Sequence, residues 1–152
     1  MTPGRLDAAE NFGRALNDLV WNLEIPSSAR CRAAATSFGI ARDHHGAMVL
    51  LFRHTFHSSG MALLRSIFEA YLRGLWLHHC ATDAQVEAHF EGANPPSTML
   101  AEIESLPVFS SGVLSKVKRD NWDAMCQYTH TGGLHLKQWQ TASSIEPSFP
   151  VE

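Results

Sequence analysis

The spacing of apolar residues predicts helices along almost the whole chain. In residues 5–23 the apolar positions recur every three or four residues, which is the period of one helix face. The same period predicts a long helix over residues 28–57 and another over residues 59–80. The His-Ser-Ser-Gly turn at 57–60 between them is short, so these two helices are expected to form an antiparallel hairpin.

The helix expected over residues 28–57 has two different faces. At 100° per residue one stripe is mostly apolar and carries a single histidine, His44, in its middle. Arg42, Gly46 and Arg53 lie on the opposite side of the helix. Gly39 and Gly46 are internal glycines, where a bend or a break is expected.

The helix expected over residues 59–80 is apolar around more than half of its circumference, which is typical of a helix packed on several sides. Its remaining stripe is charged, with Arg65, Glu69 and Arg73 at spacing i, i+4, i+8. On an open surface this ladder would contribute a few tenths of a kcal/mol per pair. Under a neighbouring element it would be a structural network instead, and a phosphate or ligand site is the third alternative.

The rest of the chain predicts shorter helices. Thr82-x-x-Gln85 fits a capping box at the start of one of them. A last long helix is expected to end near Thr129, before Gly132-Gly133. The predicted fold is therefore all-α, an antiparallel bundle of four to six helices around the hairpin of residues 28–80. Residues 1–140 are expected to form one domain, and residues 141–152 a loop-like tail.

Charge and cysteine content narrow the class of protein. The 152 residues carry a net charge of −3, which argues against general binding of polyanions, but residues 30–80 are basic and residues 81–152 acidic. The two regions can neutralise each other, or the basic one can form a face for phosphate or RNA.

Three cysteines without a C-x-x-C pair suit a reducing cytoplasm. The longest apolar run, 47–52, is too short to cross a membrane, and the N-terminus has no signal-peptide pattern. The protein is expected to be cytoplasmic.

The nine histidines suggest a metal site but lack its pattern. A metal needs several ligands that converge on one point, and helical bundles usually supply them as Glu-x-x-His or His-Glu-x-x-His, neither of which occurs here. We therefore expect no metal and no cofactor, and His44 is interpreted as a core histidine. A histidine-based metal-binding bundle remains an alternative.

Arg73 and His78 form an R-x4-H motif similar to that of HEPN-type ribonucleases. In such an enzyme the arginine would position the phosphate and the histidine would transfer the proton, without a metal. About one match to the wider pattern R-x4-6-H is expected by chance in a chain with nine arginines and nine histidines. The residue after Arg73 is glycine, where that superfamily usually has a polar residue. A HEPN-like, metal-independent ribonuclease is thus an alternative function, with Arg73 and His78 as its catalytic residues.

Two longer segments carry a second resemblance. The pattern R-S-x-x-E-A from Arg65 and the pattern H-x-G-G from His130, preceded by Asp43-His-His-Gly-Ala, resemble an uncharacterised group of bacterial all-helical proteins. The resemblance covers roughly residues 40–140. It implies a helical bundle, distantly HEPN-like, whose polar residues are Arg65, Glu69 and His130. We expect these three to meet in one cluster, with His44 nearby.

The resemblance supplies no activity, so the function expected from the sequence is general. Members of the group continue past residues 145–149 into another helix, and without it an apolar groove would stay uncovered and favour dimerisation. We expect an interaction or accessory protein that forms a homodimer, with a protein partner or, as an alternative, RNA. Whether it is an enzyme stays open.

Overall fold

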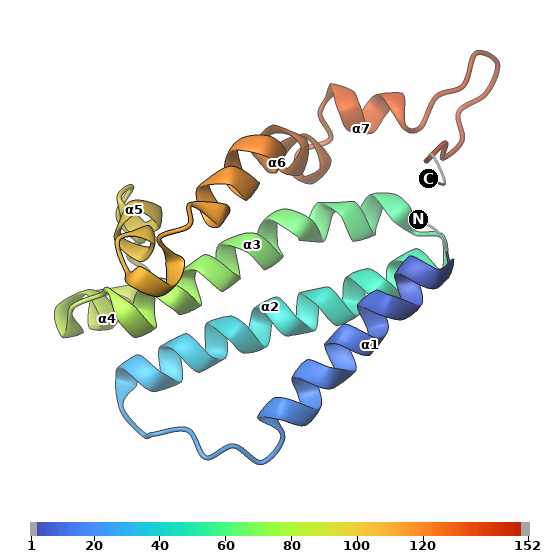
Figure 1. Cartoon of the computed structure of the whole chain (residues 1–152). Coiled ribbons are helices and arrows are strands. Elements are labelled where there is room, and N and C mark those ends of the chain that lie inside the picture. Colours follow the sequence, from blue (N-terminus) through green and yellow to red (C-terminus); the bar gives the residue numbers. More distant parts are fainter. Residues whose placement is uncertain (1–2, 150–152) are drawn as a thin grey trace. The chain divides into compact units, whose positions relative to one another are not determined.

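The computed structural model describes residues 3–149, and these residues form seven α-helices and one short 3-10 helix. Figure 1 shows their order along the chain. The only β pairing among them is an isolated bridge between Gln140 and Ile145. The predicted all-α fold class is therefore confirmed. The helices are α1 (Pro3–Val20), α2 (Ala29–Arg53), α3 (His57–His79), α4 (Asp83–Phe90), α5 (Met99–Glu104), α6 (Val113–Thr129) and α7 (Gly133–Lys137), with the 3-10 helix at Pro107–Phe109.

Contacts within the chain divide it into two compact units. The first unit consists of residues 1–22, 42–66 and 122–152, and the second of residues 23–41 and 67–121. The helices α2, α3 and α6 each contribute one part to either unit. That residues 1–140 form a single domain stays a prediction.

In the first unit α1 lies along the C-terminal half of α2 (Figure 1). The guanidinium of Arg53, at the end of α2, donates hydrogen bonds to the carboxylates of Asp7 (2.7 Å) and Glu10 (2.5 Å) on α1. The turn from α2 into α3 is tight, and Thr55 has a positive φ of 63°. A Cβ on Gly60 would lie 3.2 Å from the ring of Phe52, so this glycine lets the two helices approach closely after the turn.

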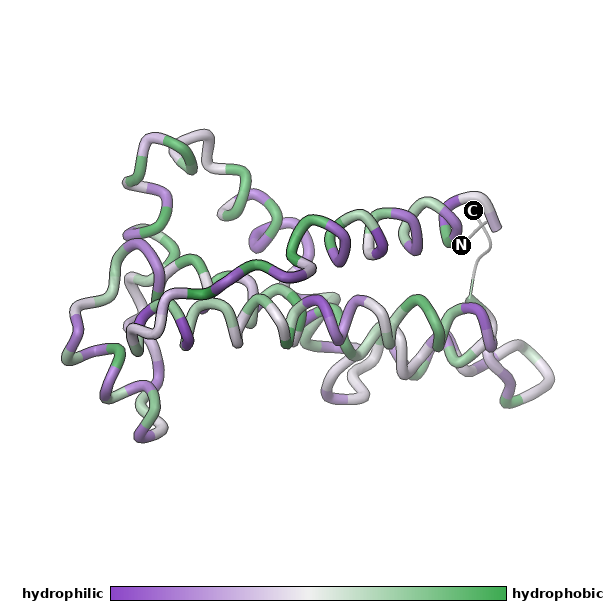
Figure 2. Tube along the Cα trace, turned by 90° about the horizontal axis from the view of Figure 1, so that it is seen from below, coloured by the Kyte–Doolittle hydropathy of each residue, from purple (hydrophilic) through white to green (hydrophobic). Residues whose placement is uncertain are grey.

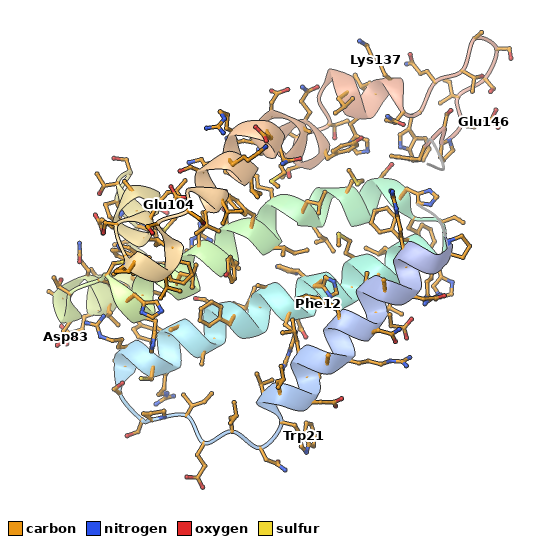
Figure 3. All side chains as sticks on the ribbon, in the orientation of Figure 1. Phe12, Trp21, Asp83, Glu104, Lys137 and Glu146 are labelled. Carbon is orange, nitrogen blue, oxygen red and sulfur yellow. The ribbon has the colours of Figure 1, made fainter. Side chains whose placement is uncertain are left out.

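The second unit has a dense apolar core around the C-terminal part of α3. Its largest fully buried side chains belong to α3, α4 and α5: Trp76, Leu77, Val86 and Ile103. The indole N–H of Trp76 donates to Glu102 of α5 at 2.7 Å, so the buried ring keeps its one polar atom satisfied. Asp83 (Figure 3) begins α4 after the capping box of Thr82 and Gln85, which is confirmed.

Arg30, near the start of α2, ties α2 to the end of α3 within the second unit. Its guanidinium donates to the carbonyls of Leu77 (3.0 Å) and Ala81 (2.5 Å) and to the carboxylate of Asp83 (2.7 Å). The last carbonyls of a helix have no partner within it, and a cation is favourable there because of the helix dipole. Arg30 thus caps α3 from another helix.

Three details of the helices differ from the sequence-based prediction. Helix α2 runs unbroken through Gly39 and Gly46, since the i to i+4 hydrogen bonds of a helix do not depend on a side chain. Helix α3 begins at His57, two residues earlier than expected. Helix α1 ends at Val20, and Asn22 beyond it has a positive φ of 62°. Turns with a left-handed residue other than glycine give no strong signal in a single sequence.

Hydrophobic and hydrophilic segments alternate along the helices, as Figure 2 shows. Among the described residues no helix is both long enough and apolar enough to cross a membrane. Residues 141–149 contain no helix.

Candidate functional site

Arg65, on α3, is the centre of a group of polar and aromatic side chains in the first unit. Its Nη1 lies 2.8 Å from Nε2 of His130 and 3.7 Å from Sγ of Cys126. Its guanidinium carbon lies 4.8 Å from the ring centroid of Trp122, the distance of a cation–π contact. Trp122 and Cys126 on α6 and His130 directly after it follow one another at intervals of four residues, which places them on one side of the helix. We call these four residues the Arg65 cluster.

The Arg65–His130 contact has one possible direction. A guanidinium has donors and no acceptor, so Nη1 of Arg65 donates and Nε2 of His130 accepts. The contact therefore joins α3 to the residue that directly follows α6.

Gly132, the first of the two glycines after His130, has a structural reason. Thr131 has a positive φ of 54°, and the backbone N–H of Gly132 donates to the carbonyl of Gln127 at 2.7 Å. A Cβ on Gly132 would lie 3.1 Å from the Cα of Gln127, which cannot yield because it is backbone. The side chain of Gln127 also accepts the N–H of Leu134 at 2.7 Å and holds the first turn of α7. The first glycine of the H-x-G-G pattern thus lets the turn after His130 close against Gln127.

The other predicted site residues on α3 belong to the second unit. The carboxylate of Glu69 accepts a hydrogen bond from Arg73 at 3.2 Å, and their side chains are 25% and 36% exposed. His78 is exposed, and its ring meets that of His79 edge-on at 4.5 Å. Residues five apart on a helix point about 140° away from each other, so Arg73 and His78 do not share a face.

His44 lies in the first unit, half-buried on α2. Its side chain makes no hydrogen bond or ion pair within residues 3–149. The structure thus brings Arg65 and His130 together and pairs Glu69 with Arg73. That all of Arg65, Glu69, His130 and His44 form one functional cluster stays a prediction.

A groove between α1 and α2 is the feature that sequence reasoning missed. It lies within the first unit and has a volume of about 420 Å³. Three arginines line it, Arg14 from α1 and Arg42 and Arg53 from α2. The helical period places Arg42 and Arg53 on the same side of α2. The groove forms because this side of α2 faces α1, about 30 residues earlier in the chain. No local sequence pattern specifies such a pairing of distant segments.

The electrostatics of the groove are dominated by Glu10. Its carboxylate is bound by both Arg14 and Arg53, and the hydrogen bond from Arg53, the largest cause, lowers the pKa of Glu10 below its ordinary value. Hydrogen bonds to Asp7 and Glu10 raise the pKa of Arg53. Arg42 makes no hydrogen bond or ion pair with any described residue, so its charge is left for another group.

Neither the Arg65 cluster nor the groove between α1 and α2 contains a set of metal ligands. Among the described residues no group of three or more histidine, cysteine, aspartate or glutamate side chains is placed to hold an ion.

Comparison with known families decides the affiliation of the chain. A model of DUF6988, a family of unknown function, matches residues 38–148, nearly three quarters of the sequence. The chain belongs to this family. The expected membership in an uncharacterised helical family is confirmed to that extent. No match was found among curated proteins or among solved structures.

The DUF6988 match covers most of the site residues. It includes Arg65, Glu69 and His130, together with the side of the groove that α2 forms. The side formed by α1 lies outside the matched residues. The Arg65 cluster is thus contained in the DUF6988 region, and the groove is shared between that region and the preceding helix.

Proposed function

We propose that this DUF6988 protein is a helical interaction module that associates with a second copy of itself through α1. The observation that carries the proposal is an apolar stripe that α1 leaves open to water. It consists of Ala8, Phe12, Ala15 and Leu19, all of them exposed, with Phe12 at 58% and Leu19 at 72%. No residue of α1 is fully buried. We call these four residues the α1 stripe.

The spacing of the α1 stripe suits helix pairing. Intervals of four, three and four residues are those of the seam along which two helices pack side by side. Burying a phenylalanine or a leucine that is otherwise exposed contributes roughly 1.5–3 kcal/mol. Phe12 and Leu19 on both copies would together contribute roughly 6–12 kcal/mol before the cost of association is subtracted.

The charges of α1 favour a second copy as the partner. Arg5 lies near the start of the helix and Asp18 near its end. In a symmetric antiparallel pair the start of each helix meets the end of the other, so opposite charges and opposite ends of the helix dipoles come together. A symmetric dimer needs only this one surface, repeated.

In this proposal the Arg65 cluster has a structural role and not a catalytic one. It fixes the end of α6 against α3 and leaves α1 free to meet its partner. All three cysteines are free thiols, which supports a reducing compartment such as the cytoplasm.

Sedimentation velocity tests the proposal. The wild type is expected to change from monomer to dimer with rising concentration in the micromolar range, and Leu19→Glu to stay monomeric. Val108→Glu is the matched control, because Val108 is also apolar and 84% exposed but lies in the second unit. A wild type that remains a monomer, or equal loss of dimer in both variants, would contradict the proposal.

The ribonuclease alternative has a separate test. Digestion of single-stranded RNA by the wild type and by His78→Ala should give no cleavage in either case if the protein is an interaction module. If the wild type cleaved the RNA and His78→Ala did not, the ribonuclease alternative would replace our proposal.

A further inference from the structure

We propose that the groove between α1 and α2 binds a small organic phosphate, a monoester with an apolar part. The inference concerns a ligand and goes beyond the proposed self-association. On a helical wheel the groove-lining residues of α1 point almost directly away from the α1 stripe. Binding in the groove and association through the stripe therefore use different faces of α1, which meet where Phe12 contacts the groove-lining His45.

The charge of the lining points to an anion. Three arginines line the groove against the carboxylate of Glu10, and Asp7 beside it also binds Arg53, so these five side chains sum to +1. Glu10 engages Arg14 and Arg53 together, whereas Arg42 has no partner within the described residues. A guanidinium presents a planar set of donors that matches phosphate and carboxylate oxygens.

A phosphate monoester fits better than a carboxylate. Its charge near neutral pH is roughly −1.5 to −2, so it is attracted to Arg42, which has no partner among the described residues, more strongly than a carboxylate is. Three terminal oxygens can accept from Arg42 and from N–H groups of Arg14 or Arg53 that do not face Glu10. A carboxylate has half of that charge and one oxygen fewer.

The apolar part of the ligand has its own place in the groove. Val49 and Leu50 of α2 line it, and Leu50 is 61% exposed. Between them and Arg42 lies Gly46, where an added Cβ would meet no atom within 4 Å. The volume of about 420 Å³ is in the range of small-molecule sites. The groove thus combines a cationic end with an apolar wall and open space.

Glycine also shapes the opposite wall. A Cβ on Gly13 of α1 would lie 3.3 Å from Nδ1 of His45, a contact that would press on the imidazole. His45 in turn meets the edge of the Phe12 ring, with centroids 5.8 Å apart. Gly13 therefore lets His45 stand close to α1 and line the groove.

Titration with phenyl phosphate at constant ionic strength, followed by NMR chemical shifts, tests the proposal. We expect saturable binding by the wild type and a loss of at least about tenfold in affinity for Arg42→Gln, as for a charge pair in direct contact. Arg32→Gln is the matched control, since Arg32 lies exposed on the same helix in the second unit and the change in net charge is equal. Its affinity should stay within about twofold of the wild type, since exposed charges beyond the Debye length are screened.

A second pair of variants tests the place of the apolar part without removing a charge. Gly46→Leu should fill the open space and weaken phenyl phosphate while leaving inorganic phosphate unaffected. Gly39→Leu is its control, because a Cβ there also meets nothing within 4 Å. Equal effects of Arg42→Gln and Arg32→Gln, no saturable binding, or tighter binding of phenylacetate than of phenyl phosphate would overturn the proposal. If the wild type dimerises but does not bind phenyl phosphate, the proposed self-association stands and the groove proposal fails. If it binds phenyl phosphate but stays monomeric, the groove proposal stands and the proposed self-association fails.

Discussion

At the scale of single residues, Gly74 is the position where a side chain matters most. An added Cβ would lie 2.6 Å from the ring of Phe38, closer than carbon atoms approach in proteins. Gly74→Ala should therefore lower the free energy of unfolding by about 1–3 kcal/mol, the usual cost of overpacking.

The control for Gly74→Ala is Gly39→Ala. Gly39 lies in a helix with no atom near its missing Cβ, so alanine should stabilise the protein by about 1 kcal/mol through helix propensity. Urea denaturation of both variants measures the difference. If both variants were equally stable, Phe38 would have to be free to move away, and the described packing of α2 on α3 would be wrong.

Glu104 makes stability depend on pH. Its carboxylate accepts hydrogen bonds from the hydroxyl and, at 2.8 Å, the backbone N–H of Ser115, in the first turn of α6. The side-chain hydrogen bond from Ser115 is the largest cause that lowers the pKa of Glu104 below its ordinary value of 4.5. Figure 3 labels Glu104 at the end of α5.

Because this pKa is lower in the folded state, the stabilisation is present above pH 4.5 and is lost as the pH falls through the folded value. Glu104→Gln should therefore reduce stability at pH 7 by about 1 kcal/mol, as for a lost helix cap, and should flatten the fall of stability below pH 4.5. Denaturation curves between pH 7 and about pH 3 measure this. Glu87→Gln, on the exposed side of α4, is the control and should keep the pH profile of the wild type. If Glu104→Gln also kept that profile, the proposed role of the Glu104 carboxylate would be wrong.

At the scale of helices, the Arg65 cluster is a junction between α3 and α6. Arg65→Lys keeps the charge but loses the planar group that lies on Trp122 and reaches His130. The double-mutant cycle of Arg65→Lys with His130→Ala should give a coupling energy of about 0.5–1.5 kcal/mol in the free energy of unfolding. A cycle of Arg65→Lys with Arg14→Gln, which share no contact, should give a value near zero. Equal coupling in both cycles would mean that the 2.8 Å contact contributes nothing specific.

The separation in sequence between interacting residues decides which features could be predicted from the sequence. The helices, the capping box at Thr82 and the hairpin turn depend on neighbours within four residues, and periodicity identifies them. The contact between Arg65 and His130 spans 65 residues, and only the resemblance of two motifs pointed to it. The groove was not predicted, because Arg14 and Arg42 acquire meaning only when α1 lies against α2. Arg30 as a cap of α3 was missed for the same reason.

At the scale of the whole molecule, the account depends on the surface that α1 turns to water. Helix α1 is 18 residues long, and none of its residues is fully buried. Trp21, just after α1 (Figure 3), is 77% exposed. Exposed aromatic and aliphatic side chains in one region are typical of interaction surfaces.

Hydrogen–deuterium exchange of α1 at two protein concentrations tests this central claim most directly. The measurement compares backbone exchange at residues 8–19 well below and well above the concentration at which sedimentation detects association. We predict that exchange in this segment slows at the higher concentration, whereas exchange in α4 stays the same. An unchanged rate in α1, or protection that arises on another helix instead, would contradict self-association through the α1 stripe.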